Sequence, residues 1–266
     1  SDGRVVLSEN VVTRTPVIPD ITNAELARAF GADLILLNGL DAFDPKVVNV
    51  DEDKQVINEL RRLVCRPIGV NLEPVDKTAT MSEEKLNIVE GRQASSKTVK
   101  ALEKLGINFI CMTGNPGTGV TNDKIVNAIS ETRKHFTGLI IAGKMHSAGV
   151  DEPVITETYV DQFIDAGADI ILVPSIGTVP GFDEEQLKNI VKAVHRREGL
   201  VMSAIGTSQE SSDPSTIRDF AIRNKICGVD IQHIGDAGYC GLGPVNNIFE
   251  LSKAIRGERH TVSMIA

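Results

Sequence analysis

The feature that most constrains the fold is a pattern that recurs four times. The segments AFGADLILLNG, KLGINFICMTG, DAGADIILVPS and KICGVDIQHIG each show the end of a helix, a glycine, a small or branched residue, Asp or Asn, and an apolar strand. A glycine at this place supplies the left-handed residue that ends a helix before the chain enters a strand. The pattern therefore predicts four helix-to-strand turns, at Gly31, Gly106, Gly167 and Gly228.

A further strand fits in each interval between these turns and before the first. Apolar segments at 4–8, 67–72, 138–143 and 200–206 are rich in Val, Ile and Leu. Such near-continuous apolar runs are typical of strands buried on both faces, as in a parallel sheet. The sequence thus predicts eight strands that begin about every 32 residues.

Helix signals occupy the gaps between the predicted strands. Thr22 and Glu25 have the spacing of a capping box, and Ser95 or Ser96 and Asp183 stand where further helices begin. Two prolines stand where a first helical residue is expected; they are Pro214 and Pro244.

Eight strand–helix units in 266 residues predict the α/β class and a closed (β/α)8 TIM barrel of eight parallel strands. We expect residues 1–266 to form a single barrel domain. The alternative is an open doubly wound sheet, which rarely needs eight regularly spaced units.

Composition excludes several functional classes. The chain has 28 basic and 36 acidic side chains, a net charge of -8 and no tryptophan, which argues against a nucleic-acid partner. The four cysteines form no Cys-x-x-Cys pair, and no apolar run approaches the ~20 residues that span a membrane. No signal-peptide pattern opens the sequence, so we expect a cytoplasmic protein without a membrane partner.

Ionisable residues follow several predicted strands, at the end of the barrel where such folds place their active sites. Groups of these types can serve as acid, base and electrophile. The alternative is that some of them point outward and cap the following helix. The candidate catalytic residues are Glu9, Glu73, Lys144, His146, His233 and Asp236.

The loops after the seventh and eighth predicted strands, AIGTSQES and HIGDAGYCGLG, resemble the phosphate site of phosphate-binding barrels. The alternative is that their glycines only make tight turns. We therefore expect a small anionic ligand, phosphorylated or carboxylated. The candidate phosphate-binding residues are Gly206, Thr207, Ser208, Gly235, Ala237 and Gly238.

A metal cofactor is left open by the sequence. Glu9, Glu73, His146, His233 and Asp236 are suitable ligands for a divalent ion, but no His-x-His or Asp-x-Asp pair lies on one of the predicted strands.

The long polar segment 73–94 has two interpretations. It is either a lid that closes over the pocket or a static excursion with a short helix around 83–89.

Lys144 directly follows the apolar segment LIIAG. If Ile140, Ala142 and Lys144 form the inward-facing set, the ammonium group emerges at the mouth of the barrel. It would then recognise an anion, form a Schiff base as barrel aldolases do, or pair with Glu9, Glu73 or Asp236.

The segment LSENVVTRTPVIPDITNAELARAFGADLILLNG resembles a bacterial barrel family that brings no established activity. Members have been labelled phosphoenolpyruvate-phosphonomutase-like or haloacid-dehalogenase-like hydrolases. The first strand ends Ser8, Glu9, Asn10 rather than Asp-x-Asp-x-Thr/Val, which excludes the dehalogenase mechanism. The Lys-x-Cys-Gly-His loop of the phosphonomutases is absent, so that relation is an analogy of fold.

Two functional hypotheses follow. The first is an enzyme of lyase, isomerase or hydrolase type that acts on a small phosphorylated or carboxylated metabolite. The second is a non-catalytic barrel that binds a phosphate ligand, as a sensor or an assembly factor. The sequence leaves the formation of a homo-oligomer open.

Overall fold

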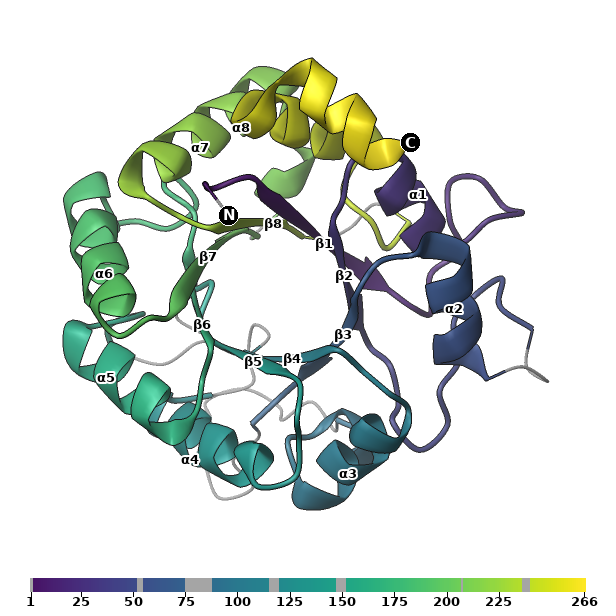
Figure 1. The fold of residues 1–266 in the computed structure, drawn as a ribbon, viewed down its shortest axis with the longest axis horizontal. Helices are drawn as coiled ribbons and strands as arrows, with labels where there is room; N and C mark the ends of the chain where they lie inside the picture. The colour runs from purple at the N-terminus through teal and green to yellow at the C-terminus, as the bar shows by residue number, and fades with distance from the viewer. Residues whose placement is uncertain are drawn as a thin grey trace.

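A computed structural model describes residues 2–51, 55–74, 88–114, 120–146, 152–206, 208–235 and 240–266, and the structural statements below refer to these residues. Eight parallel strands follow one another in chain order and close between β1 and β8 (Figure 1). The predicted (β/α)8 barrel is confirmed. The strands are β1 (Val5–Val11), β2 (Leu34–Asn38), β3 (Ile68–Leu72), β4 (Phe109–Met112), β5 (Leu139–Gly143), β6 (Ile170–Pro174), β7 (Leu200–Ile205) and β8 (Ile231–Ile234).

Helices surround the barrel (Figure 1). They are α1 (Asn23–Ala29), α2 (Val56–Val64), α3 (Ser96–Lys104), α4 (Asn122–Arg133), α5 (Glu157–Ala166), α6 (Glu184–Arg196), α7 (Pro214–Cys227) and α8 (Val245–Ile265), with short 3-10 turns η1 (Glu90–Arg92) and η2 (Gln209–Ser211).

The helix boundaries follow the signals in the sequence. Thr22 forms the predicted capping box with Glu25, and Ser95 caps α3. Pro214 is the first residue of α7, as predicted. Pro244 was expected at the same position of α8 but lies one residue earlier, at the N-cap, where its carbonyl accepts the amide of Asn247 at 2.8 Å.

Two hydrophobic layers lie on opposite sides of the strands. The interior of the barrel is filled by strand residues such as Leu7, Cys111 and Ile141. The alternate strand residues, such as Ile140 and Ala142, pack in a larger layer with side chains of the helices. Further along each strand, the side chains that alternate in step with these interior residues also face inward. At the carboxyl ends of the strands they therefore line the mouth of the barrel.

The recurring Asp or Asn of the sequence joins pairs of strands at the amino-terminal end of the barrel. In each repeat its side chain accepts the backbone amide of a residue near the start of the preceding strand. We call these four contacts the strand latches. They are Asp33 with Val6 at 2.9 Å, Asn108 with Ile68 at 3.0 Å, Asp169 with Ile140 at 2.8 Å and Asp230 with Val201 at 2.9 Å.

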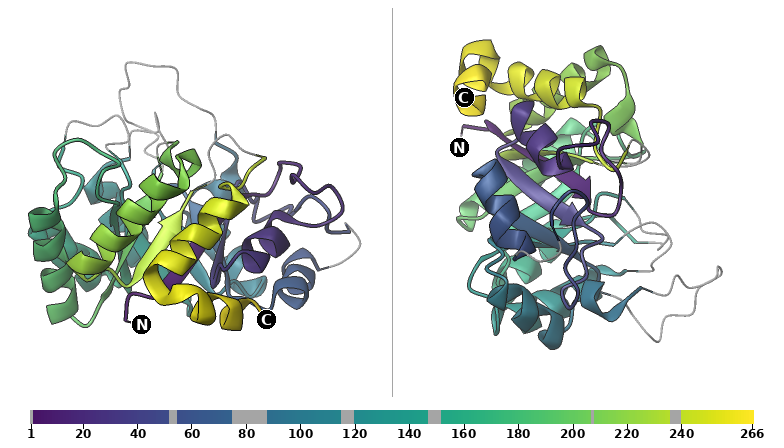
Figure 2. Two further views of the ribbon diagram at one scale, coloured as in Figure 1. Left: turned by 90° about the horizontal axis from the view of Figure 1, so that it is seen from above. Right: turned by 90° about the vertical axis from the view of Figure 1, so that its right-hand side faces the viewer.

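Each strand latch is completed by the glycine turn and, in three cases, by a basic side chain. The four predicted glycines adopt positive φ angles between 72° and 114°, so the helix-to-strand turns are confirmed. Arg256 contacts the carboxylate of Asp33 at 2.6 Å, Arg133 contacts that of Asp169 at 2.6 Å, and His195 contacts that of Asp230 at 2.8 Å. Both chain termini lie at this end of the barrel (Figure 2).

Candidate functional site

A buried histidine–carboxylate pair lies at the mouth of the barrel. The Nε2 atom of His233 on β8 is 2.7 Å from Oε2 of Glu9 on β1, and the two residues are 1% and 4% exposed. Both continue the interior phase of their strands, because Leu7 and Ile231 two residues earlier fill the barrel. The strand predicted to end at Ser8 extends to Val11, so Glu9 lies within β1 rather than after it.

The second ring nitrogen of His233 is available for proton transfer. A carboxylate only accepts hydrogen bonds, so Nε2 carries the proton in the pair with Glu9. Nδ1 is buried and has no hydrogen-bond partner among the described residues. The carboxylate thus orients the ring and leaves Nδ1 as the atom that takes or gives a proton.

Glu210 on η2 is a third ionisable group at this place, and the sequence analysis did not single it out. Its side chain is 0% exposed, and neither carboxylate oxygen has a hydrogen-bond partner in another described residue. Burial raises the pKa of Glu210; its own backbone amide and His233 oppose the rise, and the charge of Glu9 adds to it. Glu210 is therefore electrostatically coupled to both members of the pair.

The backbone of Glu210 is held in place by the last helix. Asn247 in the first turn of α8 donates from Nδ2 to the carbonyl oxygens of Glu210 at 2.8 Å and Ser212 at 2.7 Å. Asn247 is itself buried. The backbone of Glu210 is thus held by a contact that joins the loop after β7 to α8.

On the side of β3 and β4, the interior carries a thiol and two uncharged polar side chains. Cys111 on β4 lies in the interior layer, and burial, with a contribution from the charge of Glu9, raises the pKa of its thiol well above its usual value. Above it, Thr113 continues the same strand phase, and Asn71 does so on β3. Thr113 Oγ1 and Asn71 Oδ1 are buried without a hydrogen-bond partner among the described residues.

Lys144 does not have the orientation that the alternation in the sequence suggested. Ile141 fills the interior, whereas Ile140 and Ala142 belong to the outer layer, so the expected inward-facing set is wrong. Lys144 is 1% exposed and forms an ion pair with Glu152. Of the three roles considered for Lys144, a structural ion pair is observed, but with a partner that the sequence analysis did not name.

Glu152 connects this lysine to a neighbouring helix. Its Oε1 atom also accepts the backbone amide of Asn122 at 2.8 Å, at the start of α4. His146 follows Lys144 in the same loop, and its pKa is lowered by burial and by the charge of Lys144. Both effects favour the neutral form of His146.

Glu73 lies at the base of the long segment after β3. Its carboxylate is buried and pairs with Arg92 of η1 at 3.3 Å, and its backbone pairs with Gln93 in an isolated parallel bridge. The two ends of the segment are therefore joined beneath the mouth. Residues 75–87 lie outside the described residues, so the lid hypothesis stays a prediction.

The predicted phosphate loops meet at two glycines. A Cβ atom on Gly235 would lie 3.7 Å from Cα of Gly206, so the loops after β7 and β8 are adjacent. The amide of Gly235 donates to the carbonyl of Ile205 at 2.9 Å and is thus used within the sheet. Ser208 adopts a left-handed conformation before η2. Thr207, Asp236, Ala237 and Gly238 lie outside the described residues.

Metal binding and membrane insertion find no support in the described part of the chain. No three His, Cys, Asp or Glu side chains among the described residues gather closely enough to hold a metal ion. None of the described helices is both long enough and apolar enough to cross a membrane.

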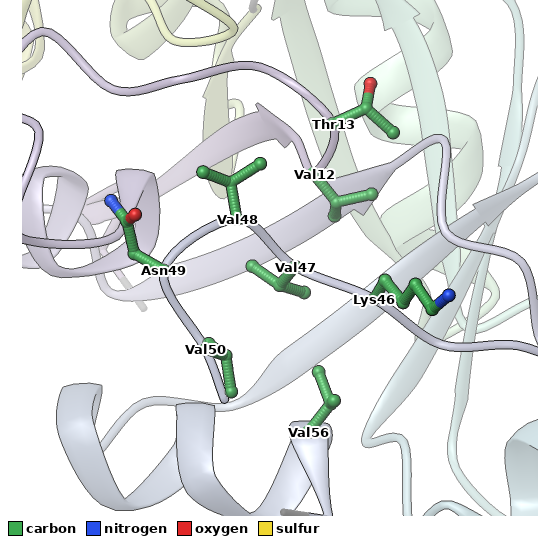
Figure 3. A pocket seen from close by; sticks show the side chains of 8 residues that line it. All are labelled: Val12, Thr13, Lys46, Val47, Val48, Asn49, Val50 and Val56. Atoms are coloured by element: carbon green, nitrogen blue, oxygen red, sulfur yellow. The ribbon is translucent and has the colours of Figure 1, made fainter. Parts of the chain in front are cut away.

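A cavity of about 400 Å³ lies beside the mouth, between the loops after β1 and β2 (Figure 3). Valine side chains line most of the cavity. Lys46 is the one positively charged residue among those that line it, and it pairs with Asp44 at 3.2 Å. Because it holds no acid–base pair, this cavity is not the candidate catalytic site. The lining residues are Val12, Thr13, Lys46, Val47, Val48, Asn49, Val50 and Val56.

Comparison with protein families places the whole chain in one of them. Residues 1–266 match the family described as "Domain of unknown function (DUF7916)". The chain belongs to this family. A search of curated proteins gave no match.

Solved structures share the fold of this DUF7916 member at low sequence identity. A provisionally assigned lyase/mutase from Burkholderia cenocepacia J2315 is 15% identical, with a TM-score of 0.53 over 87% of this chain and 76% of the other. The thiamine phosphate pyrophosphorylase of Pyrococcus furiosus is also 15% identical, with a TM-score of 0.53 over 96% of each chain. An archaeal fructose 1,6-bisphosphate aldolase is 13% identical, with a TM-score of 0.59 over 96% and 94%. At these identities the likeness concerns the fold alone.

Proposed function

We propose that this protein is an enzyme that transfers protons on a small phosphorylated or carboxylated carbonyl metabolite, in a lyase or isomerase reaction. The observation that carries the proposal is the buried Glu9–His233 pair, in which Nδ1 of His233 has no hydrogen-bond partner among the described residues and Glu210 lies within electrostatic reach. A histidine oriented by a carboxylate is a common general base, and its protonated ring can return the proton as the acid.

Two further features support this proposal. The pair lies at the carboxyl ends of the strands, the face at which barrel enzymes place their catalytic groups. Two of the structures with the same fold are named for reactions of thiamine phosphate and fructose 1,6-bisphosphate, which favours a phosphorylated substrate by analogy of fold. The phosphate would be bound by the loops that contain Gly206 and Gly235.

Hydrogen exchange in D2O tests proton transfer before the substrate is known. The protein is incubated with dihydroxyacetone phosphate, glyceraldehyde 3-phosphate, pyruvate and oxaloacetate, and deuterium uptake next to the carbonyl is followed by mass spectrometry. We expect the wild type to accelerate exchange for at least one compound, and His233→Asn to reduce the acceleration about 10²- to 10⁴-fold.

A second histidine–carboxylate pair provides a matched control. His195 lies 2.8 Å from Asp230, nearly the same distance as in the Glu9–His233 pair, but at the amino-terminal end of the barrel. We expect His195→Asn to keep the exchange activity. Exchange that is no faster with the wild type than with His233→Asn would contradict the proposal, and ligand binding without exchange would favour a non-catalytic barrel.

A further inference from the structure

The buried carboxylate of Glu210 needs a hydrogen-bonding or charged partner that the other described residues do not supply. It is wholly buried, and neither of its oxygens has a hydrogen-bond partner in another described residue. Burying a carboxylate without a partner is costly, and proteins retain such a group where something else compensates it. The contacts of Asn247 with the backbone of this turn show that the position is built and not incidental.

The charges around Glu210 favour a positive partner. Its pKa responds to both Glu9 and His233, so these three groups lie within electrostatic reach of one another. When Glu9 and Glu210 are both ionised, they carry two negative charges, and a protonated His233 supplies one positive charge. One negative charge is then left over. A cationic ligand would balance it.

The described cations near the mouth do not supply that charge. Lys144 is paired with Glu152, and Arg92 is paired with Glu73. Arg92 follows β3, which lies across the barrel from β7, and Lys144 follows β5, two strands from β7, whereas Glu210 follows β7 itself. Neither of them forms an ion pair with Glu210 among the described contacts.

We propose that Glu210 binds the amino group of the substrate, which is therefore a small amine that also carries a phosphate or carboxylate. This inference rests on the proposed function, since it names the substrate class for the same mouth. A primary ammonium group offers three donors and one positive charge, whereas a carboxylate offers acceptors only. Its hydrogen bonds with the two Glu210 oxygens would be charge-assisted and thus strong.

Two pairs of probes test this recognition. O-phosphoethanolamine is compared with ethyl phosphate, which differs by the loss of the amino group. Methylammonium is compared at equal ionic strength with tetramethylammonium, which has the same charge but no N–H donor. Binding is measured by calorimetry and by the shift in Tm, for the wild type, Glu210→Gln and Glu90→Gln. Glu90 is an exposed carboxylate on η1 that pairs with Lys97, and its substitution controls for the loss of one charge on this face.

We expect the wild type and Glu90→Gln to bind O-phosphoethanolamine about tenfold or more tightly than ethyl phosphate, and to be stabilised more by methylammonium than by tetramethylammonium. Both preferences should be lost in Glu210→Gln. Equal responses to the members of both pairs, or preferences that persist in Glu210→Gln, would overturn the inference.

The outcome is independent of the exchange experiment. An amine preference that depends on Glu210, without exchange that depends on His233, would retain the amine site and reject the proton-transfer function. Exchange that depends on His233, without an amine preference, would reject the amine site alone.

Discussion

Glu9 and His233 lie 224 positions apart in the sequence, yet Oε2 of one is 2.7 Å from Nε2 of the other. The contact exists because the barrel closes between β1 and β8, which places Leu7 opposite His233 in the strand register. The pairing of β1 with β8 that closes the barrel therefore also brings the two residues of the candidate site together.

The energetic coupling of this pair can be measured. Glu9→Leu leaves a buried imidazole without its acceptor and should lower the free energy of unfolding by about 3 kcal/mol. The double variant Glu9→Leu/His233→Leu should cost less than the sum of the single variants, because no polar partner is then left alone. Urea denaturation of the four proteins gives the coupling energy, and simple additivity would show that the pair is not coupled.

Glu210 should make stability depend on pH in a defined direction. Its pKa in the folded state is raised, so the folded protein binds the proton more tightly than the unfolded chain does. The contribution of Glu210 to the free energy of unfolding is fully present below the usual glutamate pKa of 4.5. It is lost as pH rises through the folded-state pKa. We therefore expect Glu210→Gln to gain stability relative to the wild type as pH increases from 4.5, measured by urea denaturation. A difference that stays constant or falls over this range would contradict the burial argument.

The strand latches should contribute to stability without affecting the mouth. Asp169→Ala leaves the amide of Ile140 without its side-chain acceptor and removes the partner of Arg133, so we expect a loss of about 2 kcal/mol in the free energy of unfolding. Asp161 pairs with Arg197 on the surface, and Asp161→Ala should cost at most about 1 kcal/mol. Thermal denaturation compares the two, and equal losses would mean that the latch adds nothing beyond a surface ion pair.

Gly69 should be required by the aromatic ring beside it. A Cβ atom at this position would lie 2.1 Å from the ring of Phe109 on the neighbouring strand. Gly69→Ala should therefore destabilise the barrel by about 1–3 kcal/mol through overpacking. In a Phe109→Leu background the same substitution should cost clearly less. An equal cost in both backgrounds would assign the effect to the backbone of β3 instead of the ring.

Much of the fold could be predicted because its determinants are local. The glycine turns, the helix caps and the apolar strands each depend on a few neighbouring residues, and all eight strands lie where the sequence indicated. The side that each strand residue faces was harder to predict. Both faces of these strands are buried, so the apolar pattern of β5 does not reveal that Ile141 faces inward and Ala142 outward.

The candidate site shows the same limit. Glu9 and His233 could be selected from the sequence because polar residues stand out at the ends of apolar strands. Glu210 could not, because it lies in a polar loop whose backbone is held by Asn247 from a distant helix. The hydrophilic neighbours of Glu210 give no indication that its side chain is enclosed.

The four strand latches also bear on how this fold arose. Each joins an odd-numbered strand to the next even-numbered one, so the same contact appears once in every quarter of the barrel. Such repetition is what successive duplication of an ancestral quarter would leave behind. Glu9, His233 and Glu210 have no counterparts at equivalent positions of the other quarters. The fourfold repetition is thus confined to the end of the molecule that maintains the fold, and the candidate site residues at the other end do not follow it.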